Sequence, residues 1–251
     1  MEIQVLGCDG GSLPGYTPVC FRINQSVCVD AGTLTSQLSQ EEQLKIKHIL
    51  LTHAHLDHLH ELHFLVDNRL VSKNENNDIH VYSHKKVLEA VHKGIFNNII
   101  WPDYTQTPQK NPLLHLHSVE NTPFQVEKLK IQTVPVNHAT CALGFVIDDG
   151  TNSCVFSGDT YATETLWKVA STYKNLKAVF LDLSYSNKRK DLASLARHHC
   201  TETFLKELKK IPQNVKVYAY HLKPHFYKEI EQELQGQKIE IVRKGQMIKL
   251  V

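Results

Sequence analysis

The pattern of apolar and polar residues predicts short strands that alternate with helices along the whole chain. Some segments alternate strictly, as in strands with one exposed face, and others are continuously apolar, as in strands buried on both faces. The predicted strands span residues 2–6, two within 19–29, 46–51, 79–82, 113–119, two within 124–136, 143–147, 153–156, 178–183, 215–220 and a last pair within 238–251. Asp148-Asp149-Gly150 is a hairpin signal, and Lys244-Gly245 lies within the last pair.

Helices are predicted where apolar residues recur at helical spacing. They span residues 59–66, 85–92, 163–169, 192–210 and 228–234. Another begins after Ser39, because Ser39 with Glu42 three residues later is typical of a capping box. No repeat, low-complexity tract or linker interrupts the alternation. We therefore expect residues 1–251 to form a single domain, in which two β-sheets are sandwiched between helices.

Composition excludes several classes of protein. Of the 251 residues, 41% are hydrophobic and 22% are charged, as in an ordinary globular protein with a large core. The net charge of +2 gives no strong attraction to nucleic acid or anionic lipid. No segment has the roughly 18 apolar residues of a membrane span. The first six residues are typical of a strand and not of a signal peptide, although an export signal removed earlier would leave no trace.

The six cysteines include no Cys-x-x-Cys pair, so a thiolate zinc site is not expected. In a chain of this length they are typical of small buried side chains in a reducing compartment. We therefore expect a cytoplasmic protein.

The strongest chemical signal is Thr52-His53-Ala54-His55-Leu56-Asp57-His58, directly after the apolar run 46–51. It places four metal-binding side chains within six residues at the end of a predicted strand. Imidazole and carboxylate groups are the ligands preferred by zinc and similar metals. Three further candidates follow other predicted strands: His138, Asp159 and His221. Because strand ends can converge on one cleft, the spacing predicts an open metal site.

The order and spacing of these residues resemble those of the metallo-β-lactamase superfamily. The resemblance implies an αββα sandwich of two mixed β-sheets flanked by helices, with a two-metal site at one edge. It assigns His53, His55 and His138 to the first metal, Asp57, His58 and His221 to the second, and Asp159 to both. The expected cofactors are two divalent ions, zinc by default, although manganese or iron fits the same ligands. Such a pair clamps a phosphate and activates water for in-line attack.

Motifs outside the ligands narrow the family further. They are Leu6-Gly7-Cys8-Asp9-Gly10-Gly11 with Pro14-Gly15, Val29-Asp30-Ala31-Gly32-Thr33, Leu56, Ile95-Phe96-Asn97-Asn98, Ile100-Trp101-Pro102-Asp103-Tyr104, Ser157-Gly158-Asp159, Leu181-Asp182-Leu183-Ser184-Tyr185 and His221-Leu222-Lys223-Pro224. They resemble the class II cyclic nucleotide phosphodiesterases, a branch of that superfamily, along most of the chain. The resemblance implies hydrolysis of 3′,5′-cyclic nucleotides (cyclic AMP, cyclic GMP or both) to 5′-monophosphates.

In that reaction, Asp57 or Asp159 is expected to orient the attacking water. The expected partner is a small-molecule cyclic nucleotide. No membrane or stable nucleic-acid partner is expected, and the sequence leaves open whether the chain forms a homodimer.

The resemblance also indicates substrate contacts. His198-His199-Cys200-Thr201 resembles the family segment Gly-His-Leu-Thr, which aligns His199 with a histidine near the scissile phosphate. We expect His199 to stabilise phosphate charge or to protonate the leaving oxygen. His225 and Trp101 are further candidates, the tryptophan because a nucleobase needs an apolar slot.

One position departs from the family pattern. Glu61 stands where the superfamily motif usually carries glycine, three residues after its last histidine. Our hypothesis is that Glu61 is a hydrogen-bond partner of a ligating histidine.

Two alternatives share the same metal ligands. A tRNase Z-like RNA-processing phosphodiesterase would need a basic, flexible arm, and no Gly/Pro-rich basic insertion is visible. A non-catalytic cyclic nucleotide-binding protein would capture its ligand without turnover, which the intact ligand set disfavours. A redox di-iron site is also disfavoured, because it typically has glutamate where this chain has His55.

Overall fold

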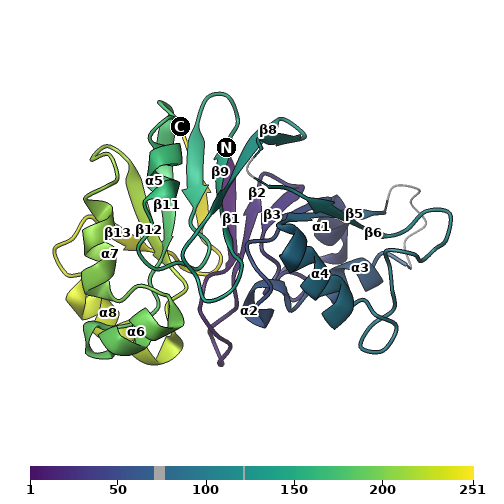
Figure 1. The fold of residues 1–251 in the computed structure, drawn as a ribbon, viewed down its shortest axis with the longest axis horizontal. Helices are drawn as coiled ribbons and strands as arrows, with labels where there is room; N and C mark the ends of the chain where they lie inside the picture. The colour runs from purple at the N-terminus through teal and green to yellow at the C-terminus, as the bar shows by residue number, and fades with distance from the viewer. Residues whose placement is uncertain (71–76, 121) are drawn as a thin grey trace.

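Two mixed β-sheets packed face to face form the centre of the computed structural model, which describes residues 1–70, 77–120 and 122–251 (Figure 1). Within these residues the first sheet has seven strands in the order β14-β1-β2-β3-β4-β5-β6. They are β1 (Glu2–Gly7), β2 (Cys20–Ile23), β3 (Val27–Val29), β4 (His48–Leu50), β5 (Ile79–Ser83), β6 (Leu114–Ser118) and β14 (Met247–Lys249). Pairing is antiparallel from β14 to β3 and parallel from β3 to β6.

The second sheet, over the same described residues, also has seven strands, in the order β13-β12-β11-β10-β9-β8-β7. They are β7 (Phe124–Val126), β8 (Leu129–Pro135), β9 (Leu143–Asp148), β10 (Ser153–Phe156), β11 (Leu176–Asp182), β12 (Lys216–Tyr220) and β13 (Ile239–Ile241). Strands β10 to β13 pair in parallel, and β7 to β10 are antiparallel. The carboxyl ends of β10, β11 and β12 therefore lie at one edge.

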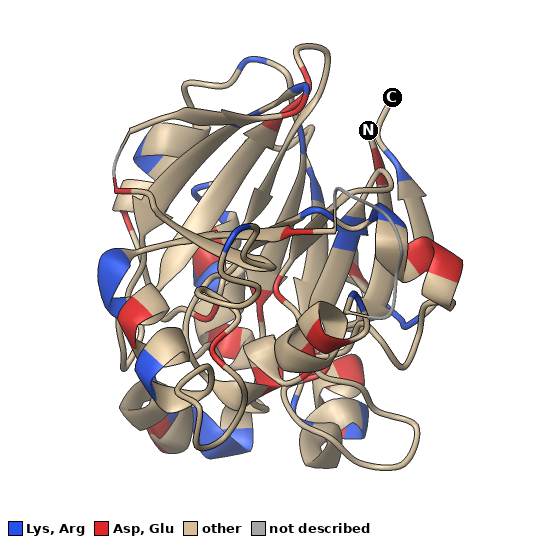
Figure 2. Ribbon diagram, turned by 90° about the vertical axis from the view of Figure 1, so that its right-hand side faces the viewer, with Lys and Arg blue, Asp and Glu red and all other residues tan. Residues whose placement is uncertain are grey.

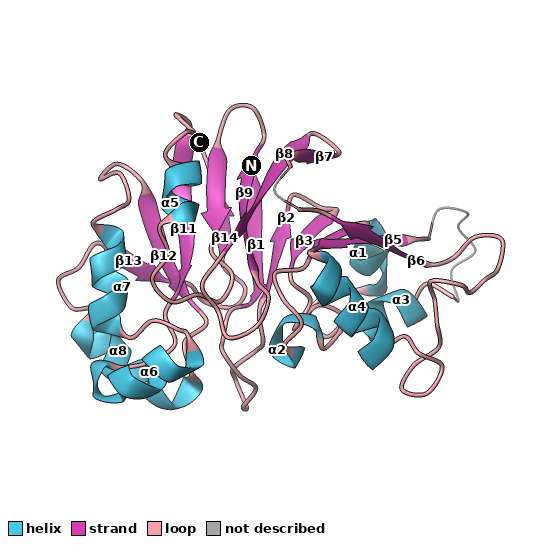
Figure 3. Ribbon diagram, viewed as in Figure 1, coloured by secondary structure: helices cyan, strands magenta, loops and turns pink. Residues whose placement is uncertain are grey.

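Helices cover the outer face of each sheet (Figure 3). Beside the first sheet lie α1 (Gln40–Lys45), α2 (Leu56–Leu59), α3 (Leu62–Asp67) and α4 (Lys85–Gly94). Beside the second lie α5 (Thr165–Ala170), α6 (Lys190–Ala196), α7 (Thr201–Leu208) and α8 (Tyr227–Glu233), with the 3-10 turns η1 (Asn187–Arg189) and η2 (Pro224–Phe226). The predicted capping box at Ser39 is confirmed at the start of α1. No helix in the described part of the chain is long and apolar enough to cross a bilayer.

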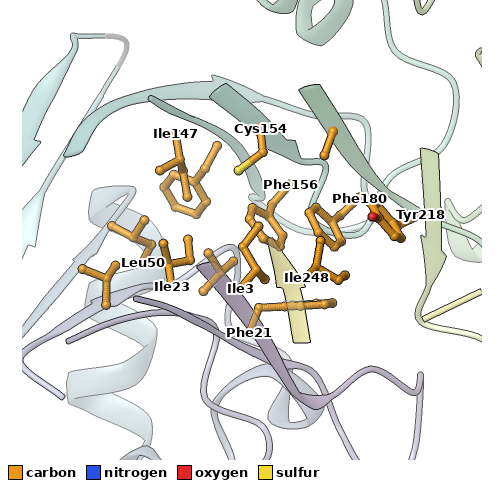
Figure 4. Packing of buried hydrophobic residues seen from close by; sticks show 14 of the residues in the cluster. Ile3, Phe21, Ile23, Leu50, Ile147, Cys154, Phe156, Phe180, Tyr218 and Ile248 are labelled. Carbon is orange, nitrogen blue, oxygen red and sulfur yellow. The ribbon is translucent and has the colours of Figure 1, made fainter. Parts of the chain in front are cut away.

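Three apolar layers hold this arrangement together. Between the sheets, Phe21 of β2 packs on Phe156 and Phe180, with ring centroids 5.1 and 5.3 Å away (Figure 4). Outside the first sheet, residues such as Leu62 of α3 pack on its strands, and Phe204 of α7 belongs to the corresponding layer outside the second. The predicted αββα sandwich is confirmed.

The long helix predicted over residues 192–210 is wrong. Helix α6 ends at Ala196, Arg197 adopts the left-handed conformation with φ of 58°, and α7 begins only at Thr201. The carbonyl oxygen of His199 accepts hydrogen bonds from the amides of Ser184 and Tyr185, both at 3.1 Å. These bonds come from the loop after β11 and hold residues 198–200 in an extended path. Helical spacing in the sequence cannot show such a long-range contact.

The last two strands form, but they do not pair with each other. Strand β13 joins the second sheet beside β12, and β14 joins the first sheet beside β1. The turn at Gly245, whose φ is 85°, carries the chain from one sheet to the other, and its amide donates to the Val5 carbonyl at 2.8 Å. Each strand therefore completes a different sheet.

Candidate metal centre

The seven predicted ligands meet where strands from both sheets end. His53 follows β4, Asp159 follows β10 and His221 directly follows β12. His138 comes after β8, and the remainder of the histidine motif leads into α2. Parallel strands end at the same edge of a sheet, so polar residues that follow them are brought together. His55 is exposed, whereas His53, His58, Asp159 and His221 are buried, which gives the cluster a dry base and an open side.

The Asp159 carboxylate lies at the centre of the cluster. Its Oδ2 atom is 3.4 Å from His53 Nε2, 3.3 Å from His58 Nε2 and 3.4 Å from His221 Nε2. One oxygen therefore faces three imidazole nitrogens that belong to both expected ligand groups, which is the position that a bridging ligand requires.

Two of the three groups of neighbouring donor atoms in the described residues match the grouping that the family resemblance implies. The first group is His53, His55, His138 and Asp159, and the second is Asp57, His58 and His221; within each, the donors lie within 4.8 Å of one another. His138 Nε2 is 3.4 Å from His55 Nδ1, and His221 Nε2 is 3.3 Å from Asp57 Oδ2. All seven predicted ligands are thus brought together.

Three buried atoms at the centre make no hydrogen bond to any residue that the structure describes: His53 Nε2, His58 Nε2 and Asp159 Oδ1. Buried polar atoms are nearly always paired, so a convergent set of unpaired ones indicates a site for ions. Nitrogen and carboxylate donors suit zinc and related divalent metals. The cluster is compatible with a dinuclear divalent metal site, and zinc itself stays a prediction.

Charges within the cluster stabilise one another. Burial raises the pKa of Asp159, but the neighbouring His221 and His58 rings outweigh burial and hold that pKa well below its usual value. Burial lowers the pKa of His221, yet Asp159 and the hydrogen bonds of its other neighbours raise it overall to about 9. For His53, burial dominates and its pKa falls well below the usual value. Metal binding at His221 therefore competes with a proton, whereas the ring of His53 is kept neutral.

Asp30 and Thr52 orient two of the histidines from behind. His58 Nδ1 donates to Asp30 Oδ2 at 2.7 Å, and His53 Nδ1 lies 3.0 Å from Thr52 Oγ1. Thr52 in turn donates to Asp30 from its amide at 2.8 Å and from its hydroxyl at 2.9 Å. Each ring is thereby held with Nε2 toward Asp159. Asp30 was not among the predicted site residues, although it too is a polar residue directly after an apolar strand.

Asp182 and Ser184 have the corresponding role on the second sheet. Ser184 Oγ donates to Asp182 Oδ1 at 2.8 Å and lies 2.8 Å from His221 Nδ1. Asp182 Oδ2 accepts from His198 Nδ1 at 2.8 Å. Sequence reasoning placed both residues in a family motif but gave them no role.

Close approach of the backbone requires glycine at two positions of the site. Gly158 has a φ of 61°, and an added Cβ there would lie 2.6 Å from the Leu143 carbonyl oxygen. A Cβ on Gly10 would lie 2.5 Å from the His221 carbonyl oxygen and 2.9 Å from its ring. Side chains at these positions would displace Asp159 or His221.

The structure places His198, and not His199, beside the ligands. His198 Nε2 lies 3.9 Å from Asp159 Oδ2, its ring stacks on His221, and its donor atoms group with those of Asp159, Asp182 and His221. His199 is fully buried, with Nδ1 3.0 Å from Thr203 Oγ1. The position beside the ligands thus belongs to His198, and the substrate contact expected at His199 stays a prediction. The break between α6 and α7 sets this choice, because it turns the two adjacent side chains in different directions.

The other two expected substrate contacts are not among the grouped donor atoms. His225 is exposed on η2. Trp101 is half-buried and lines a small cavity of about 110 Å³ together with Leu56, Leu59, His60, Ile95 and Ile100, among others. A larger cavity of about 380 Å³ is lined by the predicted ligand Asp57 and shares Leu56 and His60 with the small one.

Glu61 does not contact a ligating histidine. Its Oε2 accepts hydrogen bonds from the amides of Leu34 and Ser36 and from the Thr35 hydroxyl. Burial alone would raise the pKa of Glu61, but these donors lower it overall. Our hypothesis for Glu61 is thus wrong: its carboxylate fastens the loop after β3.

Solved structures with the same fold cover nearly the whole chain. The metallo-beta-lactamase fold protein YhfI from Bacillus subtilis is 17% identical, with a TM-score of 0.79 and 99% of each chain covered. Unliganded yeast PDE1 is 17% identical, with a TM-score of 0.82 and 98% of each chain covered. The short form of human tRNase Z is 14% identical, with a TM-score of 0.71 and 100% of each chain covered. Identities this low show a shared fold.

Sequence comparison gives a family but no individual relative. No curated protein matches the chain in sequence. The model of the beta-lactamase superfamily domain matches residues 26–221, a span that contains every predicted metal ligand. Fold, ligand cluster and family model agree, so the chain belongs to the beta-lactamase superfamily as a metal-dependent hydrolase with the metallo-β-lactamase fold.

Proposed function

We propose that this protein hydrolyses 3′,5′-cyclic nucleotides to 5′-monophosphates. The observation that carries the proposal is the set of seven donors, six of them around Asp159, which is open at His55 and adjacent to the 380 Å³ cavity that Asp57 lines. The choice of substrate is supported by the motifs around Trp101 and after His221, which resemble those of class II cyclic nucleotide phosphodiesterases. The shared fold of yeast PDE1 is compatible with it.

The proposed cofactors are two divalent ions, with zinc as the first choice. His53, His55 and His138 would hold one ion, Asp57, His58 and His221 the other, and Asp159 would contact both. Ions bound in this way polarise a phosphodiester and lower the pKa of a water molecule.

The protein's own groups supply orientation and proton transfer. Asp57 lies between the ligand cluster and the larger cavity, so it or Asp159 is suited to orient the attacking water. His198 holds Nε2 toward the cluster while Asp182 fixes its Nδ1, which suits it to protonate the 3′ oxygen that leaves. Asp30 and Ser184 keep the histidine rings from rotating.

The proposed partner is a small molecule, and the proposed compartment is the cytoplasm. Lys and Arg residues are interspersed with Asp and Glu on the described segments seen in Figure 2, and the net charge is only +2. This distribution does not favour a stable complex with nucleic acid. All six cysteines are free and lie in the described segments, which supports a reducing compartment. Whether the protein forms a homodimer stays open.

An RNA-processing phosphodiesterase is the second candidate, because the short form of human tRNase Z shares this fold over the whole chain. A non-catalytic nucleotide-binding protein is the third. One experiment separates the three. The purified protein is incubated with cyclic AMP, cyclic GMP or a precursor tRNA, after chelation and then after addition of zinc or manganese.

Metal-dependent release of 5′-AMP or 5′-GMP is the expected result. Cleavage of precursor tRNA without turnover of either cyclic nucleotide would favour the RNA-processing enzyme. Stoichiometric binding of a cyclic nucleotide without product would favour the binding protein. Either outcome would overturn the proposal.

A further inference from the structure

We propose that the base of the nucleotide binds in the small apolar cavity beside Trp101. The inference rests on the proposed function, because it takes a nucleotide as the substrate. It assigns a binding site to the base, the part of the substrate that the metal centre does not contact.

The size and lining of this cavity suit one aromatic ring system. Its volume is about 110 Å³, whereas pockets that hold a complete small ligand start at about 300 Å³. The lining combines aliphatic side chains of Leu59, Ile95 and Ile100 with the rings of His63 and Trp101. Such a surface attracts the flat, weakly hydrated face of a base and offers little to a phosphate.

A single ridge separates this cavity from the metal centre. Leu56 and His60 lie four residues apart on α2 and its end, so they share one face of that helical turn. Both line the small cavity and also the larger one. Asp57, the residue after Leu56, lines the larger cavity and reaches His221. A nucleotide with its phosphate near Asp57 therefore needs only to cross this ridge to place its base against Trp101.

Trp101 is held in place by two rings and has an unused donor. Its indole packs edge-on against His63 and Phe64, with centroids 4.6 and 5.6 Å away. Its Nε1 is buried and has no hydrogen-bond partner among the described residues. A base offers a flat face that can stack on the indole.

The rim of the cavity is apolar and exposed. Leu56 is 66% exposed and Ile100 is 64% exposed. Exposed apolar side chains that lie next to one another and next to a cavity are typical of ligand sites. Single exposed apolar side chains are ordinary on a protein surface. Leu195 on α6 is 80% exposed and does not line this cavity, so it serves as a control.

Binding of two ligands to the zinc-loaded protein tests the proposal. AMP contains a base and ribose 5-phosphate does not, so the ratio of their dissociation constants by calorimetry reports the base alone. Trp101→Leu should weaken AMP about tenfold, as expected for loss of one base–aromatic stack. Leu56→Ala should weaken it about threefold by loss of part of the cavity wall. Neither variant should change binding of ribose 5-phosphate.

Two control variants should retain AMP binding. Trp101→Phe keeps an aromatic face, and Leu195→Ala removes a leucine of similar exposure at a distant position. Equal losses for AMP and ribose 5-phosphate, or no loss of AMP binding, would overturn the proposal. If Trp101→Leu does not fold, the AMP affinity of Leu56→Ala provides the test, because the Leu56 side chain is exposed and its truncation should leave folding intact.

Turnover of cyclic AMP by the unaltered protein is measured separately. If turnover is absent while AMP binding depends on Trp101, the proposed function fails and the base site survives. If turnover is present while the variants bind AMP normally, the base site fails alone.

Discussion

Two groups of histidines in this molecule have opposite arrangements. In the metal centre, rings from several strand ends point nitrogens at one carboxylate oxygen of Asp159. The second group, which we call the histidine strip, consists of His48, His80, His115 and His117 on β4, β5 and β6. There the rings of His80 and His115 stack with centroids 4.9 Å apart and planes 18° apart.

The two groups contain the same sequence pattern. His53-Ala54-His55 and His115-Leu116-His117 each have two histidines separated by one residue. Within a strand, this spacing places both side chains on one face, and parallel neighbours lie side by side at about 4.8 Å, so rings stack. After a strand end the chain is free to turn, so rings from different strands can converge. Among the described residues, groups of three or more converging donors occur only in the metal centre.

The strip also has its own carboxylate. Asp78 Oδ2 lies 3.0 Å from His80 Nε2 and 3.4 Å from His115 Nε2. His80 Nδ1 is 2.9 Å from His117 Nε2, so this ring already has hydrogen-bond partners at both nitrogens. The difference from the metal centre is therefore that His80 and His117 of the strip pair with each other, whereas His53 Nε2 and His58 Nε2 beside Asp159 have no hydrogen-bond partner among the described residues.

The largest expected effect is the difference in activity between replacing Asp159 in the metal centre and replacing Asp78 in the histidine strip. Asp159→Ala should lower the rate of phosphodiester hydrolysis about a thousandfold or more and reduce bound zinc, since loss of groups that only orient a ligand already costs ten- to a hundredfold. Asp78→Ala is the matched control and should change neither by more than about twofold. Turnover and metal content per chain are measured on both. Equal losses in the two variants would show that the strip is also a functional metal site.

An intermediate effect is expected for the adjacent histidines 198 and 199. His198→Ala should lower kcat about a hundredfold with metal content retained, because proton transfer contributes at least that much. His199→Ala should mainly lower stability, because its ring is buried beside Thr203. Single-turnover rates and thermal melts distinguish the two. A larger loss of kcat in His199→Ala would restore the original assignment.

The smallest effect concerns the acid sensitivity of the strip. Burial lowers the pKa of His48, His80 and His117, and the charges of neighbouring histidines lower it further. The unfolded chain therefore binds protons first as the pH falls, so these rings leave stability unchanged above about pH 6.5 and reduce it below. The other charged groups that act on the strip are Asp78, Lys47 and Glu127.

Replacing His80 by glutamine should reduce this acid sensitivity. Between pH 7.5 and 5.5 the melting temperature of His80→Gln should fall by about 1–2 °C less than that of the unaltered protein. A change of about 1 kcal/mol in the free energy of unfolding would correspond to about 2–4 °C. We expect a smaller difference because the rings are half-exposed and solvent screens their charges. Parallel pH-dependent curves would contradict the expectation. Cyclic nucleotide turnover at pH 7.5 should be the same in both.

Much of the metal centre could be predicted because its ligands share a local signal. His221 follows β12, Asp159 follows β10, and the histidine motif as a whole follows β4. The residues that orient these ligands show the same position after a strand, but less clearly. Asp30 also ends a strand, but only its hydrogen bond to His58 reveals its role. Helical spacing over residues 192–210 hid the break that brings His198 to the site.

The sequence by itself determined the sandwich of strands and helices and the identity of the seven convergent candidate ligands, because periodicity and strand-end residues are local properties of the chain. Only the tertiary structure decided which of two adjacent histidines faces Asp159, where Glu61 binds, and that β13 and β14 join different sheets. These outcomes depend on hydrogen bonds between distant segments, such as those from Ser184 and Tyr185 to His199. Such bonds outweigh local propensities, which amount to less than about 1 kcal/mol per residue.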